Sequence, residues 1–197
     1  MTHFKKLTCL LLALILAFSL AGCGSEKSAV EKVIKTYTDG ARTFDLQKMA
    51  SCADGADAGS GSIAESSPEL VEIIKGWLSE MKYSVTQTTI DGDTATVVAA
   101  YTYQDAKGLM EGAYLEYYAE ALERIYGGED LDAEALNKLF IEKIKEVCRS
   151  TSPVEAKANV EFKLKKTSSG WKITGLSESA ETVFSCNIIA FIESLDN

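Results

Sequence analysis

Two segments in which apolar and polar residues alternate constrain the fold of this chain more than any other feature. Apolar side chains take every second position in residues 95–103 and again in residues 156–164. A period of two is typical of a β-strand with one buried face. Asp91-Gly92-Asp93 precedes the first segment and Ser168-Ser169-Gly170 follows the second, and both are hairpin turn sequences. The chain therefore contains two β-hairpins, the second completed by residues 171–176.

Apolar residues with helical spacing surround and separate the two hairpins. We expect a first helix over residues 29–44 and another that begins at Pro68. Two helices, one within residues 109–126 and one capped by Asp132, fill the stretch between the hairpins. One C-terminal helix is expected over residues 179–195. The predicted class is α+β, with a curved antiparallel sheet, helices packed on one face, an inserted two-helix block and a C-terminal helix.

The N-terminal segment has the pattern of an export signal. Lys5 and Lys6 precede an apolar run over residues 7–21. This run is shorter than the roughly 20 apolar residues that a membrane-spanning helix needs, and it has the length of a signal-peptide core. Small residues at its end lead directly into Cys23.

The segment resembles a bacterial lipoprotein signal, with Leu20-Ala21-Gly22-Cys23 matching the lipobox. The resemblance implies that a diacylglyceryl group is attached to the sulfur of Cys23 and that the chain is cut before it. Two acyl chains are enough for stable anchoring without a membrane-spanning helix. We expect residues 1–22 to be the signal peptide, residues 23–28 a short tether that ends in a Ser28 helix cap, and residues 29–197 one domain. The protein would be extracytoplasmic and held at the cell membrane.

Charge and histidine content exclude several classes of function. Residues 1–22 hold two of the 20 basic side chains and none of the 29 acidic ones, so the mature chain has 18 basic side chains and a formal charge of −11. This balance argues against nucleic-acid binding, which needs clustered Lys and Arg. The only histidine, His3, is removed with the signal. Histidine-based nucleophile systems and zinc sites are thereby excluded, and we expect no metal or cofactor.

Three cysteines remain after the signal and Cys23: Cys52, Cys148 and Cys186. The odd number allows one disulfide with one free thiol, or three buried thiols. Of the pairs we prefer Cys148 with Cys186, because both should lie on or at the ends of helices packed near the sheet.

Three pieces of the chain look like the NTF2-like, or cystatin-like, lipoproteins of bacteria. They are Thr36-Tyr37 through Phe44-Asp45-Leu46, the stretch Ile90-Asp91-Gly92-Asp93-Thr94-Ala95-Thr96-Val97, and Ser169-Gly170-Trp171-Lys172-Ile173. The resemblance covers most of the mature chain. It implies a cone with an open end, which in some members holds a small molecule. It transfers no site residues, and the long two-helix block departs from the simplest pattern of the family.

A cluster of tyrosines is the candidate ligand site. Tyr101 and Tyr103 lie on one face of a predicted strand, and Tyr114 and Tyr118 lie on one side of the next helix. Aromatic walls with a few hydroxyl groups are typical of ligand pockets. The alternative is a helix packed on the sheet through tyrosine rings.

We therefore expect a lipid-anchored, non-enzymatic module that binds a small apolar or amphipathic ligand, or a protein partner, at the cell envelope. One alternative is an interaction module without a pocket. The other is an enzyme based on carboxylates or tyrosines, for which Glu116, Glu120 and Glu123 on one helix face are the candidates.

Overall fold

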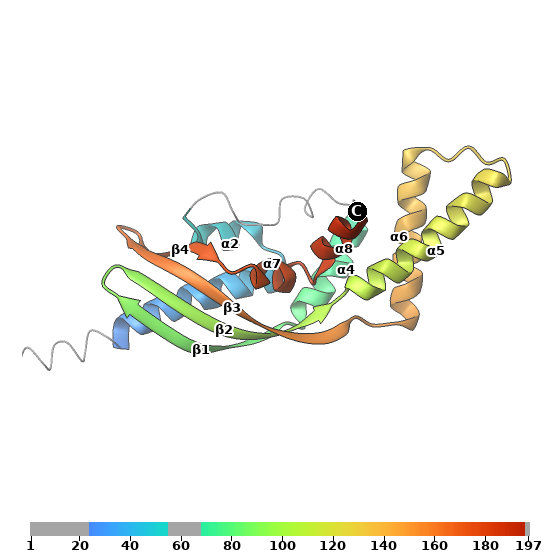
Figure 1. Cartoon of the computed structure of the whole chain (residues 1–197). Coiled ribbons are helices and arrows are strands. Elements are labelled where there is room, and N and C mark those ends of the chain that lie inside the picture. Colours follow the sequence, from blue (N-terminus) through green and yellow to red (C-terminus); the bar gives the residue numbers. More distant parts are fainter. Residues whose placement is uncertain (1–23, 55–67, 196–197) are drawn as a thin grey trace, which may run out of the picture.

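The computed structural model describes residues 24–54 and 68–195 of the chain (Figure 1). The signal segment and Cys23 lie outside the described residues, so the lipidation site stays a prediction. Within the described ranges no helix is both long enough and apolar enough to cross a bilayer.

The centre of the fold is one antiparallel sheet with the strands in sequence order. Its strands are β1 (Lys82–Asp91), β2 (Thr94–Asp105), β3 (Val154–Thr167) and β4 (Gly170–Leu176). Both predicted hairpin turns are present. Gly92 and Gly170 adopt φ angles of 56° and 109°, a region that favours glycine.

The residues that alternate in the sequence point to opposite faces of the sheet, one buried and the other more exposed. On β2 the buried residues alternate with partly exposed ones along nearly the whole strand. The buried set on β2 and β3 is Ala95, Val97, Ala99, Tyr101, Tyr103, Val160, Phe162 and Leu164. These side chains join buried residues of the helices in one hydrophobic core.

Helices cover this face of the curved sheet (Figure 1). They are the first helix (residues 24–43), α2 (Leu46–Cys52), α4 (Pro68–Ser79), α7 (Ser179–Phe184) and α8 (Ile188–Leu195). The predicted α+β architecture, with a curved antiparallel sheet and helices on one face, is confirmed.

The predicted two-helix block forms a helical hairpin that projects beyond one end of the sheet (Figure 1). It consists of α5 (Lys107–Tyr126) and α6 (Ala133–Ser150). Asp132 caps α6 as predicted, because its Oδ1 accepts a hydrogen bond from the backbone N–H of Ala135 at 2.8 Å. The two helices are also joined by an ion pair of 2.6 Å between Lys143 and Glu120.

The N-terminal helix begins earlier than predicted. Residues 24–28, expected to form the tether and the Ser28 cap, are already helical. Within this segment the Glu26 carboxylate lies 2.5 Å from Lys166 Nζ at the end of β3. This contact between distant segments is not visible in local sequence patterns.

The C-terminal segment is not one helix but two. The chain turns between α7 and α8 at Cys186 and Asn187, whose φ angles are 53° and 60°. The turn is fastened to the junction of β2 and α5: the N–H of Ala106 donates to the carbonyl of Cys186 at 2.9 Å, and Asn187 Nδ2 donates to Asp105 Oδ2 at 2.8 Å. Tertiary hydrogen bonds thus override the continuous helical pattern.

The preferred disulfide between Cys148 and Cys186 is not formed. Both residues and Cys52 are free thiols. Cys186 is fully buried in the turn after α7, whereas Cys148 is half-buried near the end of α6, beside Trp77 and Gln104. The two belong to different parts of the fold, because α6 leads away into the projecting hairpin.

Candidate functional site: an apolar cavity between the first helix and α7

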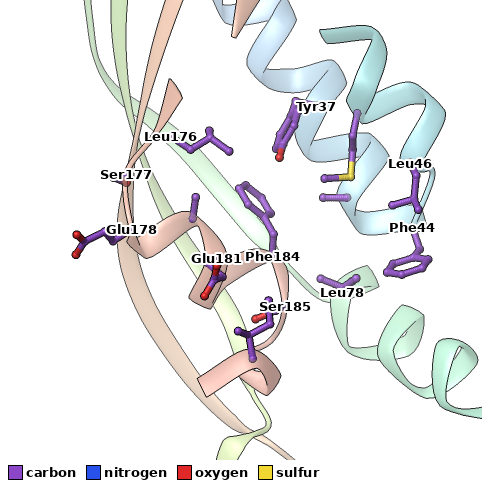
Figure 2. A pocket seen from close by; sticks show the side chains of 14 residues that line it. Tyr37, Phe44, Leu46, Leu78, Leu176, Ser177, Glu178, Glu181, Phe184 and Ser185 are labelled. Carbon is purple, nitrogen blue, oxygen red and sulfur yellow. The ribbon is translucent and has the colours of Figure 1, made fainter. Parts of the chain in front are cut away.

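A cavity of about 350 Å³ opens between the first helix and α2 on one side and α7 on the other (Figure 2). This volume lies within the range of small-molecule pockets, roughly 300–1,000 Å³. Its apolar lining residues are Tyr37, Ala41, Phe44, Leu46, Met49, Leu78, Leu176, Ala180, Phe184 and Ile189, and its polar ones are Ser177, Glu178, Glu181 and Ser185.

Aromatic rings fix the inner wall of the cavity. Tyr37 and Phe184 meet edge to face, with centroids 5.3 Å apart, and both rings point toward the hollow in Figure 2. Phe162 of β3 packs behind Tyr37 at 6.0 Å. Edge-to-face pairs stabilise by about 0.5–1.5 kcal/mol beyond the burial of their area, so this wall is preformed.

The opposite wall depends on a close approach between the first helix and α2. A Cβ added to Gly40 would lie 3.0 Å from Met49 Cγ and 3.2 Å from the backbone nitrogen of Met49. Any larger residue at this position would require Met49 and the backbone beside it to shift by a few tenths of an ångström. The turn is completed by Phe44, with φ of 54°, and by Asp45, which caps α2 through Lys48 N–H at 2.9 Å. Met49 and Leu46 are thereby placed in the lining.

Three lining residues carry a hydroxyl group, and that of Ser177 already accepts a hydrogen bond from the N–H of Glu161. Ser185 is 4% exposed, and its Oγ has no hydrogen-bond partner among the described residues. Leaving a buried hydroxyl unpaired costs about 1–3 kcal/mol. The Tyr37 hydroxyl points toward the hollow in Figure 2, and burial raises the pKa of Tyr37 to about 12. Both groups are therefore neutral at pH 7.

The charged groups of the lining are all acidic. Glu181, in the first turn of α7, and Glu178, the residue before this helix, are both exposed at the rim. The Glu178 carboxylate points away from the hollow in Figure 2. Among the residues that the structure describes, no lysine, arginine or histidine lines the cavity. The arrangement can hold an apolar body, hydrogen-bond a polar group and repel an anion.

The four tyrosines predicted as a ligand site do not line this cavity. Tyr101 is 1% exposed, and its hydroxyl lies 2.7 Å from Thr38 Oγ1. Its ring stacks on Tyr83 at 5.6 Å and meets Phe184 at 5.4 Å. Tyr103 is also buried in the sheet core. Neither residue lines the cavity, although Tyr101 supports Phe184 from behind.

The other two predicted tyrosines lie on α5 in the projecting hairpin. Tyr114 contacts Tyr118 at 6.2 Å and packs on Phe140 and Phe191. Tyr118 is 53% exposed. The structure therefore divides the four tyrosines between the sheet core and the hairpin, and does not bring them together around one hollow.

The carboxylates considered for an enzyme also lie on α5. Glu116 and Glu123 are exposed, and Glu120 is paired with Lys143 and Arg124. Hydrogen bonds donated by Lys143 and Arg124 are the main reason that the pKa of Glu120 is lowered, and the positive charges of the two side chains add to the effect. Among the described residues, no group of three or more histidine, cysteine and acidic side chains could hold a metal ion.

Sequence reasoning missed the cavity residues because they come from distant segments. One signal was available: Ser185 is a polar residue within the predominantly apolar stretch of residues 183–192. A polar residue that becomes buried is an informative position.

No protein-family model matches the chain, and no match among curated proteins was found. Solved structures with a similar backbone exist. An NTF2-like protein with a cystatin-like fold from Novosphingobium aromaticivorans is 11% identical, with a TM-score of 0.45, and the match covers 85% of this chain and 94% of that one.

Two further structures have informative descriptions. A "putative lipoprotein" of Bacillus subtilis is 19% identical, with a TM-score of 0.42, and the match covers 79% of this chain and 46% of that one. A "putative ketosteroid isomerase" from Shewanella frigidimarina is 11% identical, with a TM-score of 0.39, and the match covers 75% and 92%.

The expectation of a non-enzymatic protein is corrected by these comparisons. Besides the "putative ketosteroid isomerase", the similar structures include a "putative dehydratase" from Streptomyces avermitilis and a "putative aromatic ring hydroxylase" from Novosphingobium aromaticivorans. Proteins described as enzymes are thus among those with a similar backbone.

Proposed function

We propose that this protein is a lipid-anchored protein of the cell envelope that binds a small apolar or amphipathic molecule in the cavity between the first helix and α7. The observation that carries the proposal is the cavity itself, since a hollow of about 350 Å³ with a mainly apolar lining is what a small ligand would fill.

The anchor part of the proposal rests on the lipobox at residues 20–23. Because the described helix starts at residue 24, an acyl chain on Cys23 would hold the body close to the bilayer. The start of this helix lies beside the hairpin turns, at the end of the sheet opposite to α5 and α6 (Figure 1). Fatty-acid labelling that is lost in Cys23→Ser supports this part, and continued labelling refutes it.

Ligand binding is tested with N-phenyl-1-naphthylamine, a neutral probe that fluoresces in apolar surroundings. The native protein should bind the probe, and Ala180→Phe, which fills the cavity, should abolish binding. Leu46→Trp fills it from the α2 side and serves if the first variant does not fold. Leu115→Ala on α5 is the matched control. Absence of binding, or full binding by both filled variants, refutes the proposal.

A second candidate function is docking of a protein partner on α5. The exposed apolar side chains Leu115 (69%), Tyr118 (53%), Ile125 (48%) and Tyr126 (85%) form a stripe at helical spacing. Exposed apolar stripes of this kind mark interaction surfaces. Glu116 and Glu123 flank it and make no ion pair with a described residue. The complementary partner is an amphipathic helix with basic flanks.

This candidate is tested with a synthetic Leu/Lys amphipathic helix and a Leu/Gln analogue. The basic peptide should bind more tightly, and the double variant Leu115→Ser with Tyr126→Ser should weaken its binding by about tenfold. Val154→Ser, which changes an exposed apolar residue on β3, should have no effect. Equal binding by all variants, or self-association through the stripe, contradicts the docking of such a partner.

A further inference from the structure

We propose that the cavity selects amphiphiles whose polar end is a hydrogen-bond donor, either a hydroxyl or an ammonium group, and rejects carboxylates of the same length. This inference rests on the proposed function, because it names the class of ligand for the same cavity.

The first argument is the unpartnered hydroxyl of Ser185. The residue lines the cavity, is 96% buried and has no hydrogen-bond partner among the described residues. Buried polar groups in folded proteins are almost always hydrogen-bonded. A ligand group beside Ser185 that can donate or accept a hydrogen bond would satisfy it.

The second argument is the negative charge at the rim of the cavity. Glu181 lies one helical turn before Ser185, and the N–H of Ser185 donates to the Glu181 carbonyl at 3.0 Å. An ionised carboxylate such as that of Glu181 can only accept hydrogen bonds, and Glu178 adds a second negative charge beside the rim. Since none of the described lining residues is a cation, an incoming carboxylate would meet negative charge and no positively charged hydrogen-bond donor. A hydroxyl or an ammonium group can donate to these oxygens.

The third argument is the separation of polar and apolar lining residues. Ser177, Glu178, Glu181 and Ser185 all lie on or next to α7, whereas Phe44, Leu46 and Met49 lie on the α2 side. Figure 2 shows Phe44 and Leu46 on the side of the hollow opposite to Ser177, Glu181 and Ser185. The ligand should therefore lie with its polar end at α7 and its apolar body toward α2.

The test is displacement of bound N-phenyl-1-naphthylamine by four compounds of matched length: octylamine, octan-1-ol, heptyl methyl ether and octanoate. We expect the amine and the alcohol to displace the probe at concentrations at least about tenfold lower than octanoate, which corresponds to about 1.4 kcal/mol. The ether accepts but does not donate, and it should be weaker than the alcohol. Equal potency of octanoate and octylamine, or of ether and alcohol, overturns the inference.

Two variants assign the selectivity to named residues. Glu178→Gln with Glu181→Gln should raise the potency of octanoate and reduce that of octylamine. Glu116→Gln with Glu123→Gln on α5 makes the same change in net charge and should leave both unchanged. If the α5 pair has the effect of the rim pair, the selectivity comes from net charge and not from the cavity.

Ser185→Ala gives an independent readout. It should weaken displacement by octan-1-ol several-fold and raise the melting temperature of the free protein, because an unpaired buried hydroxyl is removed. A lower melting temperature with unchanged alcohol binding contradicts the role of Ser185. Failure of the probe to bind the native protein refutes the proposed function, whereas probe binding without selectivity refutes only this inference.

Discussion

Thr38 Oγ1 and Tyr101 Oη lie 2.7 Å apart in the core, where they join the first helix to the centre of β2. Both residues are almost fully buried. Removing one hydroxyl leaves the other without this partner, which costs about 1–3 kcal/mol. Tyr101→Phe and Thr38→Val should each lower the free energy of unfolding by this amount in urea denaturation. The double variant should lose less than the sum, and strict additivity would contradict the coupling.

Alkaline pH should destabilise the protein through its buried tyrosines. Burial raises the pKa of Tyr37 to about 12 and also raises the pKa of Tyr101. A raised pKa in the folded state means that the stability is complete below the unfolded value, near 10, and is lost as pH rises toward the folded value. Melting temperatures measured from about pH 9 to pH 12 should fall. The fall should be smaller in Tyr37→Phe and unchanged in Tyr126→Phe, whose ring is exposed.

Acidification should weaken the contact between α5 and α6. The pKa of Glu120 is lowered by its hydrogen bonds with Lys143 and Arg124. A lowered pKa means that the stabilisation is present above the unfolded value of 4.5 and is lost as pH falls through the folded value. The melting temperature should therefore fall below about pH 5, and less so in Glu120→Gln. A matched variant, Glu116→Gln, should follow the native curve.

The three thiols should react at different rates with a disulfide reagent at neutral pH. Burial raises the pKa of Cys186 to about 12, and the residue is fully buried. Cys148 is half-buried, although burial raises its pKa too. Since the thiolate is the nucleophile, Cys148 should react first and Cys186 only after unfolding. The fast phase should disappear in Cys148→Ser and persist in Cys52→Ser.

The turn between α7 and α8 should depend on Asn187. Asn187→Gly keeps a residue suited to φ of 60° but loses the hydrogen bond to Asp105, whereas Asn187→Ala loses both. A non-glycine residue in this region costs about 1–2 kcal/mol. We therefore expect the alanine variant to be less stable than the glycine variant in thermal unfolding. The reverse order would show that the φ angle is not limiting.

The hairpins and most helix ends were predictable because their signals are local. Asp91-Gly92-Asp93, Pro68 and Asp132 each act within a few residues, through φ preference or a cap. The class of fold followed from the order of these elements. The early start of the first helix was not predicted, and its contact between Glu26 and Lys166 joins segments far apart in the sequence.

The site was less accessible to sequence reasoning than the fold. The tyrosines were a sensible choice by residue type, but Tyr101 is used for packing and Tyr118 lies on the projecting hairpin. The cavity is made by Gly40, which lets Met49 come close, and by Ser185 after α7. Nothing in a single sequence shows that these segments meet.

The register between β2 and β3 has a consequence for how this chain folds. Asp105 and Val154 are direct neighbours in the sheet, although the whole α5–α6 hairpin lies between them in the sequence. The central pair of strands therefore closes only after a long loop has been closed, which is entropically slow. If α5 and α6 pair first, they bring the two strand ends together and shorten the search. The helical hairpin would then act as a folding nucleus for the sheet, although most of it projects beyond the end of that sheet.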